Sequence, residues 1–195
     1  MRALELQRFL REELAHRQGN ILAVVLALAE QSAAQAPSLD SFRAVFAGRL
    51  SALAAMNALL NRKGWDVSLE DVFEAVARPV RKSGRIGGGG STATLAPKAA
   101  VTLGLIFHEL LQAPGSTEPR IRAHRRAGRL CLVWTSPGLR DLGEGGDDFP
   151  RRLIDHAVRH EFDGRWVLFR RKKGAAACFE FPLSHSAWAR PGAVA

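Results

Sequence analysis

The chain contains 195 residues, 47% of them hydrophobic, which is enough for one medium-sized domain or two small ones with packed cores. A formal net charge of +9 favours acidic partners, such as nucleic acid, an anionic surface or an acidic protein. The sequence has no apolar run as long as the roughly 18 residues of a membrane span and no signal-peptide pattern, so it predicts a cytoplasmic protein without a membrane segment.

A long helix is predicted from about Ala3 to Ala34, and it carries a single histidine, His16. Its apolar positions form a seam for a partner helix: Leu14, Ile21, Val25 and Leu28. His16 lies roughly 200° around the helix from Leu14, so it points away from this seam, on the side of Asn20 and next to Arg17. Such a residue is either a solvated surface histidine or a nucleophile that accepts a phosphoryl group, because imidazole is neutral near pH 7.

A second helix is predicted after the turn at Pro37, with Ser38 as its N-cap. It has a seam of its own, made of Phe42, Phe46, Leu50, Leu53, Asn57 and Leu60. Two amphipathic helices joined by a short turn form an antiparallel hairpin. A hairpin alone cannot cover both seams, so we expect a homodimer with a four-helix bundle; the alternative is packing against the rest of the same chain.

The remaining pattern predicts a mixed α/β unit. Ser68 and Asp71 resemble a capping box at the start of a helix that ends near Val76. The run Gly87–Gly90 lacks the Gly-Lys-Ser/Thr sequel of a phosphate loop, so we interpret it as a flexible hairpin turn. The later elements are expected as a strand at 92–95, a helix from Pro97 to before Pro114, strands at 120–125 and 130–135 turned at Ala127-Gly128, a helix at 149–162 and a hairpin of 166–170 with 176–181.

These elements predict three regions. Residues 1–64 form the helical hairpin, residues 65–185 form the α/β domain, and residues 186–195 form a flexible tail, with disorder expected after Ser184. The fold class is therefore α+β.

The order His16-Arg17-x-x-Asn20, following Glu13-Leu14, resembles the phosphoacceptor box of the HWE/HRxxN group of bacterial sensor histidine kinases. Further landmarks of that group follow along the chain: Leu95–Ala100 opening the nucleotide-domain helix, His108-Glu109-Leu110 beginning the N box, Trp134, and Leu153-Ile154. The resemblance implies a dimerisation and phosphotransfer hairpin followed by an ATPase-like α/β sandwich. It implies that His16 is the phosphoacceptor, with Arg17 as a charge partner and Asn20 as a positioning group.

The residues that would hold ATP in this family are replaced. Ala113 stands where the N box has the Asn that helps to hold Mg²⁺, and a methyl group cannot bind a hard cation that requires oxygen. Ser136 lies in the segment after Trp134, where the family's acidic residue is missing. Asp148 and Pro150 stand at glycine positions of the phosphate segment, and proline has no N–H to offer a phosphate. We therefore expect a degenerate ATPase domain without a cofactor.

This combination predicts a histidine phosphotransfer protein of a two-component phosphorelay rather than an ATP-dependent kinase. His16 would exchange a phosphoryl group with response-regulator receiver domains, and the receiver would supply Mg²⁺. The alternative is a non-catalytic pseudokinase that binds and regulates a response regulator or a kinase.

Two other functions receive less support from the sequence. Nucleic-acid binding lacks a known motif, although basic residues could form patches: Arg120, Arg122, Arg125, Arg126, Arg129, Arg151, Arg152, Arg170, Arg171, Lys172 and Lys173. A metal site is not expected, because His108-Glu109 lacks a second histidine and His156 and His160 have no third ligand. We interpret Glu109 as a helix-surface acid and the two cysteines, Cys131 and Cys178, as buried, reduced thiols.

Overall fold

The computed structural model divides the chain into two compact units, Met1–Leu50 and Ser51–Ala195. The boundary lies inside a long helix, α2 (Leu39–Lys63). The structure describes residues 21–34, 36–64, 66–80, 84–89, 93–137, 149–171 and 174–188.

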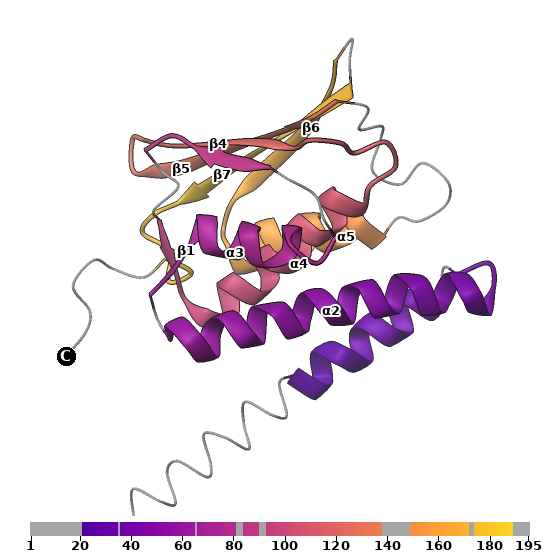
Figure 1. Cartoon of the computed structure of the whole chain (residues 1–195). Helices are drawn as coiled ribbons and strands as arrows, with labels where there is room; N and C mark the ends of the chain where they lie inside the picture. Colours follow the sequence, from indigo (N-terminus) through magenta and orange to yellow (C-terminus); the bar gives the residue numbers. More distant parts are fainter. Residues whose placement is uncertain are drawn as a thin grey trace, which may run out of the picture. The chain divides into compact units, whose positions relative to one another are not determined.

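The first unit contains two helices joined by a short turn, as the sequence predicts (Figure 1). Residues 21–34 are helical, and α2 (Leu39–Lys63) begins after Ser38. The Ser38 Oγ accepts the Ser41 N–H at 3.2 Å, so the predicted N-cap is confirmed.

A buried arginine joins these two helices, which the apolar seams did not predict. Arg49 of α2 is only 1% exposed, and its Nη1 donates to the Ser32 Oγ at 2.7 Å. The Ser32 hydroxyl in turn donates to the Leu28 carbonyl oxygen at 2.6 Å. The adjacent residue Leu50, expected in the seam, is 39% exposed in the single chain.

Among the described helices, α2 is long and apolar enough to cross a membrane by length and composition alone. The core helices of many proteins satisfy the same criterion, and Arg49 near the middle of α2 would be costly in a bilayer. The absence of a membrane segment therefore stays a prediction.

The second unit contains a five-stranded mixed sheet with the strand order β2-β4-β5-β7-β6. The strands are β2 (Arg85–Gly87), β4 (Arg120–Arg126), β5 (Arg129–Ser136), β6 (Arg165–Arg171) and β7 (Gly174–Pro182). β2 runs parallel to β4, and all other neighbours are antiparallel. The expectation of a hairpin turn starting at Gly87 is wrong, because this residue pairs with Arg122 in a parallel ladder. A separate two-stranded sheet pairs β1 (Val67–Ser68) with β3 (Thr94–Leu95).

The tight turn between β4 and β5 is located where the sequence predicts it. Ala127 and Gly128 both have positive φ, 48° and 71°. Two such residues in succession match the right-handed twist of the flanking strands, which is why two-residue hairpin loops use them. The predicted strands on either side are confirmed to within two residues.

Helices α3 (Leu69–Ala77), α4 (Pro97–Gln112) and α5 (Phe149–His156) lie on one face of the large sheet (Figure 1). α5 continues into a π-helical turn, η1 (Ala157–Glu161). The capping box at the start of α3 is confirmed. Between the helices and the sheet, Phe73, Phe107 and Trp134 pack with ring centroids 5.7 to 5.9 Å apart. The predicted mixed α/β fold of this half is confirmed.

The chain remains folded beyond Ser184. Trp188 is 5% exposed, pairs with Leu95 in an isolated bridge and packs against the rings of Phe162 and Phe181. The Ala96 N–H donates to the Ala187 carbonyl oxygen at 2.9 Å. The expected disorder after Ser184 is therefore wrong for residues 185–188.

The two cysteines are thiols, as expected, but they are only half-buried, so the expectation that they are buried is wrong. Cys131 of β5 pairs with Glu180, and Cys178 of β7 pairs with Val133. Both side chains alternate with buried neighbours along their strands, so they lie on the face of the sheet opposite the helices.

Candidate functional site

The expected phosphoacceptor box lies outside the described residues. His16, Arg17 and Asn20 directly precede the helix that is described from Ile21 onward. The roles assigned to these three residues therefore stay predictions.

The structure describes three of the four positions at which the family would hold ATP. The first of these positions is Ala113. This residue follows α4, and its N–H donates to the Glu109 carbonyl oxygen at 2.9 Å. Its side chain is 6% exposed. A buried methyl group at this place offers no ligand to Mg²⁺.

Ser136, the last residue of β5, is tied into the turn that follows α4. Its Oγ donates to the Thr117 carbonyl oxygen at 2.6 Å and accepts the Thr117 N–H at 2.9 Å. The Ser116 Oγ lies 3.2 Å away, and the Ser116 N–H donates to the Ala113 carbonyl oxygen at 3.0 Å. The structure thus brings Ala113 and Ser136 together in one hydrogen-bonded turn, which we call the 113–117 turn.

Pro150 is the second residue of α5, and Asp148 lies outside the described residues. The first N–H groups of a helix have no partner inside the helix, so proline is tolerated there. Pro150 therefore has a structural place in α5 and brings no N–H group for a phosphate. The described residues do not fit the Mg-ATP that the family implies.

His108 and Glu109 are buried in α4, at 5% and 6% exposure. The interpretation of Glu109 as a helix-surface acid is wrong. α4 is buried without interruption from Thr102 to Leu111, because it lies between α3 and the rest of the second unit. The signal was present in the sequence, since a helix that is apolar on nearly all sides is a core helix.

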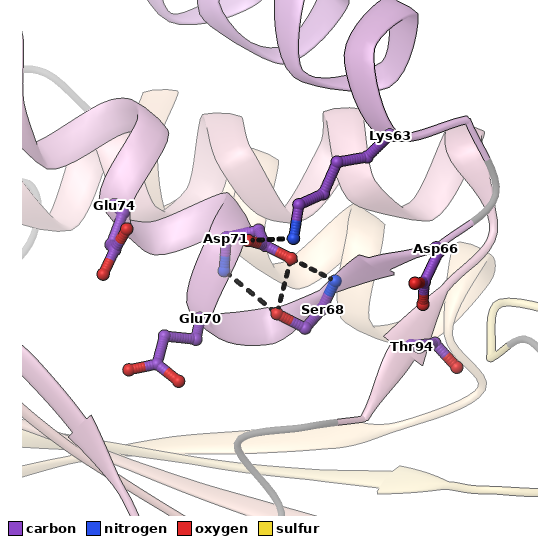
Figure 2. A pocket seen from close by; sticks show the side chains of 7 residues that line it. All are labelled: Lys63, Asp66, Ser68, Glu70, Asp71, Glu74 and Thr94. Atoms are coloured by element: carbon purple, nitrogen blue, oxygen red, sulfur yellow. Dashed lines mark hydrogen bonds and ion pairs between the residues drawn. The ribbon is translucent and has the colours of Figure 1, made fainter.

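A hollow of about 350 Å³ lies beside α3 (Figure 2). Its lining is mostly acidic and consists of Lys63, Asp66, Ser68, Glu70, Asp71, Glu74 and Thr94. Asp71 receives the Lys63 Nζ at 2.7 Å and the Ser68 N–H at 2.9 Å. Burial alone would raise the pKa of Asp71, but these hydrogen bonds outweigh it and lower the pKa below 3.8. The carboxylate is therefore engaged in capping α3, and the acidic lining would repel phosphates.

Within the described part of the chain, no three His, Cys, Asp or Glu side chains are placed to hold a metal ion. The rings of His156 and His160 lie 4.9 Å apart and both residues are exposed, as expected of two surface histidines. The neighbouring Asp155 accepts from the Arg159 Nε at 2.8 Å, which lowers the pKa of this carboxyl group.

The fold is similar to that of histidine kinase domains. It is similar to the histidine kinase domain of the Erythrobacter litoralis EL346 blue-light-activated histidine kinase, with a TM-score of 0.58, 14% identity, and coverage of 87% of this chain and 96% of that chain. The structure of the whole EL346 protein matches with a TM-score of 0.60, 16% identity, and coverage of 88% of this chain and 60% of that chain. At these identities the likeness concerns the fold alone.

Residues 13–91, which include His16, Arg17 and Asn20, match the family model of the HWE histidine kinases. The chain is also 29% identical over 150 residues to blue-light-activated histidine kinase 1 of Erythrobacter litoralis strain HTCC2594, covering 70% of this chain. It spans 42% of that relative's length. The resemblance to the HWE histidine kinases is confirmed.

Proposed function

We propose that this protein is a histidine phosphotransfer protein of a bacterial phosphorelay and does not use ATP. The observation that carries the proposal is the 113–117 turn. In this turn a buried methyl group and a fully engaged serine hydroxyl stand where the family's nucleotide-binding residues are expected. The match over residues 13–91 meanwhile includes the histidine box. A chain that keeps the phosphoacceptor and lacks the nucleotide ligands suits transfer between receivers.

In the proposed reaction, the lone pair of a neutral His16 ring nitrogen attacks the phosphorus of an aspartyl phosphate on a receiver domain. The bond between phosphorus and the aspartyl oxygen breaks, and the aspartate carboxylate leaves with the electron pair. Arg17 offsets the charge of the phosphoryl oxygens, and Asn20 positions them by hydrogen bonding. The receiver supplies Mg²⁺, and the reverse reaction passes the group to a second receiver.

The proposal includes a cytoplasmic homodimer. The first unit exposes a set of large apolar side chains that a second copy could cover: Ile21, Leu22, Leu26, Leu39, Val45 and Leu50. Apolar exposure of this kind on a helical hairpin favours association into a bundle. Sedimentation equilibrium of the chain measures the oligomeric state, and a strict monomer would contradict this part.

The test of phosphotransfer uses the full chain with radiolabelled ATP alone and then with a receiver domain phosphorylated on its aspartate. We expect label on the protein only with the phosphorylated receiver, and no label in the His16→Gln variant. The matched control is His156→Gln, which removes an exposed histidine of the second unit and keeps the labelling.

Labelling of the protein by ATP alone would contradict the proposal and would show that the protein is an ATP-dependent kinase. If no label transfers but the receiver still binds both the wild type and His16→Gln, the protein is the alternative, a pseudokinase that regulates by binding. No melting-temperature shift is expected with Mg-ATP.

A further inference from the structure

The outer face of the large sheet, opposite the helices, is formed by alternate side chains of β4 to β7. In β4 the buried residues Ile121 and Ala123 alternate with exposed neighbours, and β5 shows the same alternation. The strand register then defines three rows across this outer face. The rows are Arg120-Thr135-Ala176-Phe169, Arg122-Val133-Cys178-Val167 and His124-Cys131-Glu180-Arg165.

The outer face carries a strong excess of positive charge. Its arginines are Arg120, Arg122, Arg126, Arg129 and Arg165. Its one acid is Glu180, and this carboxylate is already held by the Arg165 Nη2 at 2.7 Å and the Arg129 Nε at 3.5 Å. No described carboxylate lies within ion-pair distance of Arg120, Arg122 or Arg126, so the β4 side of the face offers unneutralised guanidinium groups.

The middle of the β6 side of the outer face is apolar. Val167 and Phe169 of β6 are 50% and 53% exposed, and Val133 and Cys178 beside them are half-buried. An apolar strip with a charged border is the arrangement that protein interfaces have. Exposed apolar strips of this kind on a folded domain mark interaction sites more often than chance.

We propose that the outer face binds an amphipathic helix of a partner protein, with acidic side chains on one flank. The apolar stripe of such a helix would cover Val167 and Phe169, and its acids would meet the arginines of β4. The helix would give the sheet a second helical layer, opposite α3, α4 and α5. A second copy of this chain docked through the same face is a poor occupant, because both faces would carry the excess of arginines.

Nucleic acid is the less suitable polyanion. Base stacking needs several exposed aromatic rings, whereas the three rows contain one phenyl ring, that of Phe169, and one imidazole, that of His124. The valines, alanine and cysteines around it offer no hydrogen bonds to bases, whereas they are suitable neighbours for leucine side chains. This proposal does not depend on His16, so it stands or falls separately from phosphotransfer.

The experiment measures binding of the full chain to a fluorescent helical peptide of Leu, Ala and Glu with one apolar stripe. Arg122→Glu is expected to weaken binding by about tenfold or more through like-charge repulsion, and Phe169→Ser is expected to weaken it through lost apolar contact. The matched control is Arg151→Glu, which makes the same charge change at an exposed position of α5 and keeps the wild-type affinity. The His16→Gln variant is also expected to bind as the wild type does.

Three results would overturn the proposal. One is the absence of peptide binding, and another is equal binding of a peptide in which Lys replaces every Glu. The third is displacement of the peptide by poly-dT, or by vesicles of equal parts phosphatidylserine and phosphatidylcholine, with the same sensitivity to Arg122→Glu. That result would assign the face to nucleic acid or to an anionic membrane.

Discussion

The Ser136 hydroxyl bonds to both backbone groups of Thr117, donating to its carbonyl oxygen at 2.6 Å and accepting its N–H at 2.9 Å. Ser136 is 3% exposed whereas Thr117 is exposed, so both bonds are partly buried. One side chain therefore fixes the end of β5 to the turn that follows α4.

The Ser136→Ala substitution is expected to destabilise the protein by about 1–3 kcal/mol, because it removes two partly buried hydrogen bonds that each contribute about 0.5–1.5 kcal/mol. Urea unfolding followed by circular dichroism measures the change. The exposed Ser184→Ala variant is the control and is expected to remain within about 0.5 kcal/mol of the wild type. Equal stability of the two variants would show that water replaces the serine.

Because Ser32 and Arg49 are in contact, we expect the effects of their substitutions on the free energy of unfolding to be non-additive. Ser32→Ala removes an acceptor from a guanidinium group that is 1% exposed, and a loss of about 1–3 kcal/mol is expected. Arg49→Met replaces the charge by an apolar side chain of similar length, and such replacements of buried charges are often tolerated. In the Arg49→Met background, Ser32→Ala is therefore expected to cost less.

The double-mutant cycle of Ser32 and Arg49 is measured by thermal unfolding of the four proteins. Additive losses would show that the 2.7 Å contact does not couple the two helices energetically.

Asp71 predicts a pH dependence of stability. Its pKa is lowered below 3.8 in the folded protein, so its contribution is complete above pH 3.8 and is lost as the pH falls through the folded pKa. The Asp71→Asn variant is expected to be less stable at neutral pH and to approach the wild type in acid. The control is Glu70→Gln, an exposed neighbour on the same turn of α3. Parallel stability profiles of Asp71→Asn and the wild type between neutral pH and pH 3 would contradict this assignment.

Because Trp188 is buried, we expect two truncated chains that differ in length by four residues to differ in stability. A chain that ends at Ser184 loses the buried Trp188 side chain and its contacts with Phe162 and Phe181. We expect a loss of about 3–5 kcal/mol, the range for removing a large buried aromatic side chain. A chain that ends at Trp188 keeps these contacts and is expected to melt within a few degrees of the wild type. The comparison uses differential scanning calorimetry, and equal melting of both truncations would contradict the role of Trp188.

Features that depend on neighbouring residues could be predicted from the sequence. Ser68 and Asp71 cap α3 through contacts three residues apart, and Ala127-Gly128 form a turn by their own φ angles. Each of these two patterns involves only residues a few positions apart, so the structure it predicts does not depend on contacts with distant parts of the chain.

Features that depend on a distant partner could not be predicted in this way. β2 is a strand because three residues pair with β4 more than thirty positions later, and a glycine-rich run gives no local sign of this. Arg49 is buried because Ser32 on another helix accepts its hydrogen bond. Trp188 is ordered because Leu95 pairs with it.

The candidate site likewise has features that the sequence predicts and features that only the fold reveals. The replacements at Ala113, Ser136 and Pro150 are visible in the sequence, whereas the bonds through Ser116 and Thr117 that join the first two are visible only in the fold.

This joining limits the routes by which the chain could change in evolution. A side chain with an oxygen ligand at position 113 alone would enter a turn that the hydrogen bonds of Ser136 still hold in place. A substitution of Ser136 alone would remove these hydrogen bonds without supplying a ligand. Under the proposed function, a gain of nucleotide binding would therefore need both changes, and it would pass through a less stable intermediate.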